Sequence, residues 1–237
     1  MRRVAAGLAV LALAGCSDLS SSDDTVIALQ VTAPPGSVVE VGDTVQYTAV
    51  ALNRDGVAIP AEITWSTPDT ANIIVDSVTG EVIGKTGGTQ ARVQAISQGL
   101  VSPLNIITVV VTADTLILVP PDTLSVDTLT ATGTPPLVAR LESLSPPGPV
   151  VGRLILYEVV EPVFADPSTR TVELSNLALA DTATTGSNGE PSVAITLQRV
   201  PGVTPPDSAI VEISATKHQG TEVVAGSGQR WIVRFIK

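Results

Sequence analysis

Residues 44–51 decide the fold, and they read TVQYTAVA. Apolar side chains occupy every second position from Val45 through Tyr47 to Ala51, and the residues between them are mostly polar. A repeat of two residues places alternate side chains on opposite faces of an extended strand, so the pattern is typical of a half-buried β-strand. The stretch NRDG at 53–56 follows as a turn.

The same pattern recurs along the rest of the chain, and no stretch shows the 3.6-residue period of an amphipathic helix. In the first half, further strand-like runs lie at 26–32, 62–65, 82–84, 90–95 and 105–111. In the second half, they lie at 116–119, 137–144, 150–160, 169–179, 193–198, 211–216 and 230–235. The sequence therefore predicts an all-β chain with two β-sandwiches, at 26–112 and 113–237.

The composition limits the chemistry that the chain can perform. Its 237 residues include one Cys, one His and only 3% aromatic residues. This composition excludes a disulfide-stapled fold, a zinc ribbon and a cluster of His ligands. The net charge of −10 is unfavourable for binding nucleic acid, which proteins hold through Lys and Arg. We therefore expect no cofactor, no metal centre, no nucleic-acid partner and no enzymatic activity.

Four landmarks in the first half follow one another in a fixed order. They are Val41-Gly42-Asp43-Thr44, Thr64-Trp65-Ser66, Val75-Asp76 with Thr79-Gly80-Glu81-Val82, and Gly88-Thr89. In this order and spacing they resemble bacterial immunoglobulin-like domains of group 2, the type found in invasin- and intimin-like surface proteins. The resemblance covers almost all of residues 26–112 and implies an immunoglobulin-like sandwich. It departs from the family pattern at Pro60-Ala61 and Thr67-Pro68-Asp69.

The landmarks also have physical reasons. Gly42 and Gly80 stand where turns need a positive φ. Trp65 shares a strand face with Ile63, so we expect it to fill the core of the sandwich. The alternative role for Trp65 is a platform on which a sugar stacks.

The second half contains its own set of landmarks. Gly148-Pro149-Val150-Val151-Gly152 leads into an apolar run at 154–159, and the stretch 184–191 precedes a run at 193–197. These features resemble bacterial immunoglobulin-like domains of group 1 over about residues 148–216, with GEP at 189–191 in place of the usual Gly-Lys-Ala. The resemblance implies a second sandwich, for which Trp231 is the expected core residue.

The N-terminus resembles that of a bacterial lipoprotein precursor. Arg2 and Arg3 precede an apolar run at 4–14, which is shorter than the roughly 20 residues that a membrane-spanning helix needs. The run ends in the lipobox Leu13-Ala14-Gly15-Cys16. The resemblance implies that residues 1–15 are a signal peptide, cut between Gly15 and Cys16, and that acyl chains attached at Cys16 anchor the protein.

Residues 16–25 are polar and acidic, so we expect a flexible tether. Loss of Arg2 and Arg3 would bring the net charge to about −12. The pair Asp23-Asp24 could touch Ca²⁺, although a solvated tether is the simpler interpretation. By resemblance to enterobacterial sorting, Ser17 after the cysteine implies the outer membrane, with the surface or periplasmic face left open.

Two groups in the second half are candidate sites. His218 lies beside a Gly turn and is expected to be a solvated loop residue, since a catalytic base would need an oriented partner. Arg230, Arg234 and Lys237 lie on the outer face of the last strand-like run. We expect them to protect an edge strand from pairing with another chain, and contact with carbohydrate or lipopolysaccharide phosphate is the alternative.

A third candidate lies near the boundary between the halves. Asp114, Asp122 and Asp127 could together bind Ca²⁺, which prefers oxygen ligands, although the chain has no Asp-x-Asp-x-Asp-Gly loop.

These patterns predict a lipid-anchored cell-envelope protein that presents two immunoglobulin-like domains as a non-catalytic stalk, adhesion or binding module. Its expected partners are the membrane, through the lipid anchor, and a protein or glycan ligand. Two alternatives remain open: an accessory subunit of an envelope protein complex, or an enzyme acting on polysaccharide through a pair of carboxylates.

Overall fold

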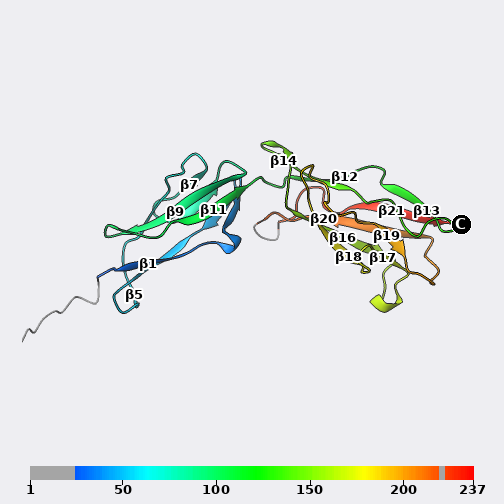
Figure 1. Cartoon of the computed structure of the whole chain (residues 1–237), viewed down its shortest axis with the longest axis horizontal. Coiled ribbons are helices and arrows are strands. Elements are labelled where there is room, and N and C mark those ends of the chain that lie inside the picture. Colours follow the sequence, from blue (N-terminus) through cyan, green and yellow to red (C-terminus); the bar gives the residue numbers. More distant parts are fainter. Residues whose placement is uncertain (1–24, 219–221) are drawn as a thin grey trace, which may run out of the picture.

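The computed structural model describes residues 25–218 and 222–237. This part is all-β apart from two single-turn 3₁₀-helices, η1 (Pro35–Ser37) and η2 (Pro167–Thr169), and forms tandem immunoglobulin-like sandwiches, as predicted. The strands of residues 26–112 lie at one end of an elongated molecule, and those of residues 113–237 lie at the other (Figure 1). Residues 26–112 form the N-terminal sandwich, and residues 113–237 form the C-terminal sandwich.

The N-terminal sandwich contains eleven strands, most of them short. Their bounds are β1 (Ala28–Thr32), β2 (Val38–Glu40), β3 (Thr44–Gln46), β4 (Thr48–Leu52), β5 (Ala58–Ile59), β6 (Thr64–Ser66), β7 (Ile73–Val75), β8 (Glu81–Gly84), β9 (Thr89–Ser97), β10 (Leu100–Val101) and β11 (Asn105–Val110). They form sheets of order β1-β4-β5, β10-β9-β11-β2 with β6 beside β9, and β3-β8-β7.

The decisive run at 44–51 is confirmed as extended backbone, in which β3 and β4 are separated by Tyr47. Val45, Tyr47 and Ala51 are buried and Ala49 is half-buried, as the alternation predicts. Tyr47 is still hydrogen-bonded at this interruption, because its backbone N–H donates to the carbonyl of Gly80 at 3.0 Å.

The C-terminal sandwich contains ten strands. Their bounds are β12 (Thr115–Leu118), β13 (Thr123–Asp127), β14 (Ala139–Leu144), β15 (Pro147–Pro149), β16 (Leu154–Glu161), β17 (Val172–Leu174), β18 (Ala180–Thr184), β19 (Leu197–Arg199), β20 (Ser208–Ser214) and β21 (Gln229–Ile236). They form sheets of order β12-β14-β15, β13-β21-β20-β16-β18 and β17-β19.

In each sandwich the chain crosses from one sheet to the other between its first two strands. In the N-terminal sandwich, β1 pairs antiparallel with β4, whereas β2 pairs parallel with β11. In the C-terminal sandwich, β12 pairs antiparallel with β14, whereas β13 pairs parallel with β21. A proline pair, Pro34-Pro35 or Pro120-Pro121, lies at each crossing, where it interrupts backbone pairing because proline has no N–H.

The predicted run at 193–198 is only partly a strand. Ile195 and Leu197 are buried, but Val193 is 66% exposed, and β19 begins only at Leu197. Just before this run the backbone forms turn contacts and not a strand pairing, since Ser192 N donates to the carbonyl of Thr184 at 2.8 Å.

Each sandwich encloses its own apolar core. One cluster draws on buried residues between 26 and 109, and the other on buried residues between 113 and 233. Trp65 and Trp231 are buried in these clusters, at 6% and 1% exposed, so the predicted core role is confirmed for both. The positive φ expected at Gly42 and Gly80 is also present, at 84° and 75°.

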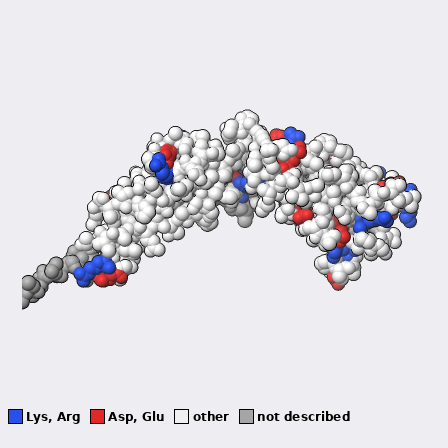
Figure 2. Space-filling model, in the orientation of Figure 1, with Lys and Arg blue, Asp and Glu red and all other residues white. Residues whose placement is uncertain are grey.

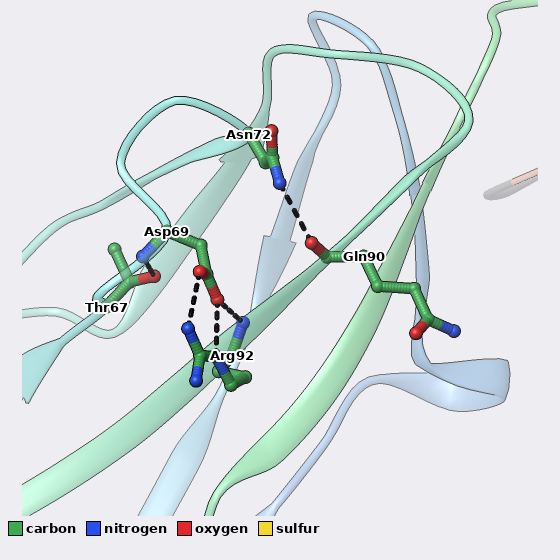
Figure 3. A network of polar contacts seen from close by, with 5 residues as sticks. All are labelled: Thr67, Asp69, Asn72, Gln90 and Arg92. Carbon is green, nitrogen blue, oxygen red and sulfur yellow. Dashed lines mark hydrogen bonds and ion pairs between the residues drawn. The ribbon is translucent and has the colours of Figure 1, made fainter.

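A polar network fixes the connection between β6 and β7 to β9 (Figure 3). Asp69 accepts three hydrogen bonds of 2.8 Å from Arg92: one from the backbone N–H and two from the guanidinium. Asn72 donates to the carbonyl of Gln90 at 2.9 Å. The guanidinium of Arg92 lowers the pKa of the Asp69 carboxyl, chiefly by hydrogen bonding to it.

Candidate functional site

An ion pair between the two sandwiches is the most unusual polar feature of the described residues. Glu40 ends β2 in the N-terminal sandwich, and Arg153 immediately precedes β16 in the C-terminal one. The Arg153 guanidinium bonds the Glu40 carboxylate through Nη1 and Oε1. The side chain of Glu40 is fully buried, and that of Arg153 is 9% exposed. The two residues therefore meet only where the sandwiches touch.

Neighbouring backbone groups complete this contact. Arg153 Nη2 donates to the carbonyl of Thr216 at 2.9 Å, and the backbone N–H of His218 donates to Glu40 Oε1 at 2.9 Å. Arg153 is also held through its own backbone, whose N–H donates to Thr185 Oγ1 at 3.0 Å. Thus Glu40 receives donors from two segments of the C-terminal sandwich.

Burial makes this ion pair sensitive to change. Removing one partner of a buried pair typically costs about 3–5 kcal/mol, because the other charge is left without compensation. Glu40 Oε2 has no hydrogen-bond partner in the structure. The hydrogen bonds that offset the buried negative charge, from Arg153 and His218, therefore all go to Oε1. The junction therefore depends strongly on Arg153.

Two further ionisable groups, His218 and Lys217, lie beside the pair. His218 is exposed, as predicted for a loop residue, and partial desolvation together with the charge of Arg153 lowers its pKa. A hydrogen bond to Glu222 raises the pKa of Lys217. The nearby charge of Glu40 acts in the opposite direction on the pKa of His218 and is the smaller influence.

A crevice of about 280 Å³ lies beside the ion pair. Val38, Val110 and Val111 line it from the N-terminal sandwich, and Val150 and Val151 line it from the C-terminal one. Its walls are thus mainly aliphatic, and Arg153 and His218 add polar groups to the lining.

The predicted lipidation site lies outside the described residues. Gly15, Cys16 and the pair Asp23-Asp24 all precede residue 25, so the cleavage, the lipid attachment and the tether remain predictions. Within residues 25–218 and 222–237, no helix is long and apolar enough to cross a membrane.

The proposed calcium cluster does not form. Asp114 Oδ2 accepts a hydrogen bond from Leu144 N at 2.7 Å, and Asp127 Oδ1 accepts one from Leu129 N at 2.9 Å. Asp114 precedes β12 and is bonded to the end of β14, whereas Asp127 ends β13 and caps its own local turn, so the two carboxylates have separate partners. Across the described ranges, no three His, Cys, Asp or Glu side chains gather closely enough to hold a metal ion.

The edge-strand role of Arg230, Arg234 and Lys237 is wrong. The strand β21 is an inner strand of its sheet, since it pairs with β20 on one side and with β13 on the other. Alternating apolar and basic residues describe the two faces of a strand but not its neighbours. Arg230 instead pairs with Glu212 of β20, at 2.7 Å.

The sequence prediction missed Glu40 and Arg153. A signal was present, because each is a single charge within an apolar stretch, Val38-Val39-Glu40-Val41 and Val150-Val151-Gly152-Arg153-Leu154. A charge in such a place needs a partner when the stretch is buried. The chain nevertheless offers many opposite charges, and the sequence does not indicate which one lies close in space.

The fold and the junction define tandem immunoglobulin-like sandwiches joined by a buried ion pair. No protein-family model matches the chain, and no curated protein matches it.

Several solved structures are distantly similar. The adhesin InvE of Yersinia pseudotuberculosis is 13% identical, with a TM-score of 0.42 over 88% of this chain and 59% of that one. This chain thus spans less than two thirds of that adhesin structure. Domains 4 and 5 of the S-layer protein SbsC are 16% identical, with a TM-score of 0.33 over 90% of this chain and 99% of that one. The fibronectin(III)-like modules of Clostridium thermocellum CbhA are 13% identical, with a TM-score of 0.39 over 88% and 93%.

Proposed function

We propose that the chain is a lipid-anchored cell-envelope protein whose two sandwiches form a non-catalytic stalk that presents a binding surface. The buried pair of Glu40 and Arg153 carries this proposal, because it opposes bending between the two sandwiches. The lipobox that ends in Cys16 supplies the anchor in the proposal.

The energetics support a stalk of fixed shape. Bending that separates the sandwiches would break the hydrogen bonds of Glu40 to Arg153 and His218. Separation also rehydrates both charges, which returns part of the lost energy, so the net resistance is smaller than the cost of deleting one partner. A stalk needs only a modest preference for one shape.

The surface agrees with a protein or glycan ligand. On the face drawn in Figure 2, charged side chains lie in small separate groups, and no broad area has a single sign. The net charge of −10 opposes contact with nucleic acid or anionic headgroups.

Labelling of Cys16 tests the anchor. Cells that express the chain are fed an alkyne analogue of palmitate, and the wild type is expected to incorporate label and to sediment with membranes. Cys16→Ala is expected to lose the label and leave the membranes. Unchanged membrane retention of Cys16→Ala would disprove the anchor.

Solution scattering tests the stalk. Arg153→Met leaves Glu40 buried without its cation, so we expect the two sandwiches to separate and the distribution of interatomic distances to broaden. Arg92→Met is the matched control, because it breaks an ion pair inside one sandwich and should leave the shape unchanged. Identical scattering from Arg153→Met and the wild type would count against a stalk fixed by this pair.

A further inference from the structure

The five-stranded sheet of the C-terminal sandwich has two edges, β13 and β18, and they differ in how their backbone is covered. Val159 N of β16 donates to the carbonyl of Leu179, and Thr185 N donates to the carbonyl of Arg153 just before β16, both at 2.7 Å. The odd-numbered residues of β18 therefore direct their backbone groups toward β16. Ala180, Thr182 and Thr184 therefore direct their backbone groups away from the sheet.

Each of these outward residues on β18 has a local partner. Asn176 Nδ2 donates to the carbonyl of Ala180, the N–H of Thr182 donates to Asp181 Oδ1, and Ser192 N donates to the carbonyl of Thr184, all at 2.8 Å. Each outward residue of β18 thus has one backbone group already occupied, so this edge is less available to another strand.

The edge of β13 is open. Ile232 N donates to the carbonyl of Asp122, and Thr128 N donates to the carbonyl of Ile236, both at 2.8 Å. In a parallel ladder these bonds direct the even-numbered residues toward β21 and leave Thr123 and Ser125 facing outward. Within the described ranges, no hydrogen bond is recorded for the backbone N–H or C=O of Thr123 or Ser125.

The side chains of β13 do not block the edge either. Thr123 and Ser125 are exposed and small, and the strand contains no Pro or Lys. By contrast, the edge strand β15 of the neighbouring sheet carries Pro147 and Pro149, which cannot donate. A row of unpaired backbone groups is a template for a further strand.

Basic groups lie next to this open edge. Arg234 is the register partner of Ser125 and is exposed. Arg230 is neutralised by Glu212, whereas no ion pair is recorded for Arg234 or Lys237 among the residues that the structure describes. Because Ser125 is small, the long side chain of Arg234 can reach across it to an acidic residue on an added strand.

An open hollow of about 440 Å³ lies at the other end of β13. Leu118, Pro120 and Pro121 form its apolar part, and Asp122, Gln229 and Arg230 form its polar part. A strand laid along β13 would pass this hollow, which can accept one apolar side chain. The edge thus offers backbone hydrogen bonds for affinity, with one apolar and one basic subsite for specificity.

We propose that the β13 edge binds an extended acidic segment of a partner protein by strand addition. Acidic side chains of the segment face Arg234 and Lys237, and an apolar side chain enters the hollow beside Pro120 and Pro121. A second copy of this chain is the competing occupant, and the experiment below distinguishes the two. The inference rests on the proposed binding role and names its ligand class.

The test is fluorescence anisotropy with the full chain in detergent. The probe is a short labelled peptide in which Val and Thr alternate with Glu, with Leu at one end. Ser125→Pro removes an outward N–H without removing a ladder bond to β21, so it should weaken binding at least about tenfold. Thr182→Pro on β18 is the matched control, because its N–H is already bonded to Asp181, and it should leave binding unchanged. Thermal unfolding followed by circular dichroism checks that both variants fold.

Charge provides a second readout. Arg234→Gln should weaken binding about two- to fivefold and reduce its dependence on salt. A peptide with Lys in place of Glu should bind more weakly to the wild type.

Equal affinity of wild type and Ser125→Pro, or no binding by the wild type, would overturn the inference. So would a dimer in sedimentation that Ser125→Pro abolishes, because a second copy would then be the occupant. Labelling of Cys16 is independent of all these results, so failure here is distinguishable from failure of the anchor.

Discussion

The two sandwiches use the same pair of aromatic residues in different ways. Each contains one Tyr and one Trp, and these account for all Tyr and Trp in the chain. In the N-terminal sandwich, Tyr47 and Trp65 meet edge to face, with ring centroids 6.0 Å apart and planes at 60°. In the C-terminal sandwich, Tyr157 and Trp231 stack at 5.9 Å and 11°.

The Trp also comes from a different strand in each case. Trp65 lies on β6, beside β9, whereas Trp231 lies on β21, between β13 and β20. A core of small aliphatic residues needs a large side chain to fill its centre, but the strand that supplies it is not fixed. The comparison teaches that an equivalent core volume can be filled from different positions of one fold.

Deletion of each Trp should have the largest effect. Trp65→Ala and Trp231→Ala should each destabilise their own sandwich by about 3–5 kcal/mol, because each leaves a cavity in a core of small residues. Each variant retains one Trp, whose fluorescence reports on the other sandwich. In urea, circular dichroism should therefore show an early transition that the remaining Trp does not report. Coincident transitions would mean that the two sandwiches unfold as one unit.

Gly80 provides a second difference between the two cores, because it packs against the Trp of the N-terminal sandwich. A Cβ at this position would lie 2.6 Å from two atoms of the Trp65 ring, and φ is +75°. Gly80→Ala should therefore destabilise the N-terminal sandwich by about 2–4 kcal/mol through left-handed strain and a clash with the ring. Gly202→Ala is the control, since its φ of +77° is similar but its surroundings are open. Equal losses in thermal unfolding would show that contact with Trp65 does not matter.

Alkaline pH tests the buried Tyr of the edge-to-face pair. Desolvation raises the pKa of Tyr47 to about 12 from an ordinary value of 10.0. Because the folded pKa lies above the unfolded one, the stabilisation is complete below pH 10 and is lost as pH rises toward 12. The loss should reach about 2–3 kcal/mol at still higher pH.

Tyr47→Phe is the control for this titration. The Tyr47 hydroxyl is buried without a hydrogen-bond partner, so its removal should cost little at neutral pH. Urea unfolding across the alkaline range should then show a smaller decline than the wild type. An identical decline in both proteins would assign the effect to other groups.

The smallest effect is expected at the exposed loops. Asp69 and Arg92 fix a loop of the N-terminal sandwich, while in the C-terminal one Arg170 of a loop pairs with Glu173, a buried residue of β17. The folded pKa of Asp69 is lowered, so its stabilisation is present above the unfolded pKa and is lost as pH falls through the folded pKa. Melting of Asp69→Asn should show slightly lower stability than the wild type at neutral pH and no difference in strong acid. A constant difference at all pH values would exclude this cause.

Much of the fold follows from local pattern. Alternation at 44–51 and at 90–95 sets which side chains are buried, because period two assigns faces without knowledge of the neighbouring strand. Pairing is different: β13 lies beside β21 in parallel although more than a hundred positions separate Val126 from Phe235, its register partner. For this reason the local pattern predicts an edge position for β21, whereas β21 lies inside the sheet.

The same distinction applies to the candidate site. The role of Trp65 could be read from its own strand, whereas the junction needs Glu40 and Arg153 to meet across two domains. Each charge is anomalous in its own apolar stretch, but only the packing of the two sandwiches shows that one compensates the other. The three Asp residues near the boundary failed as a cluster for the converse reason, since closeness in sequence did not bring them together.

The parallel pairs described above have a mechanical consequence. If the chain is held at its N-terminus and pulled at its far end, the parallel strands β2 and β11 are drawn along each other in opposite directions, and so are β13 and β21. The backbone hydrogen bonds between them are then loaded in shear and must break together, instead of opening one at a time. The first pair has three residue partners in register and the second has five. In a single-molecule pulling experiment the N-terminal sandwich should therefore yield first, at the lower force.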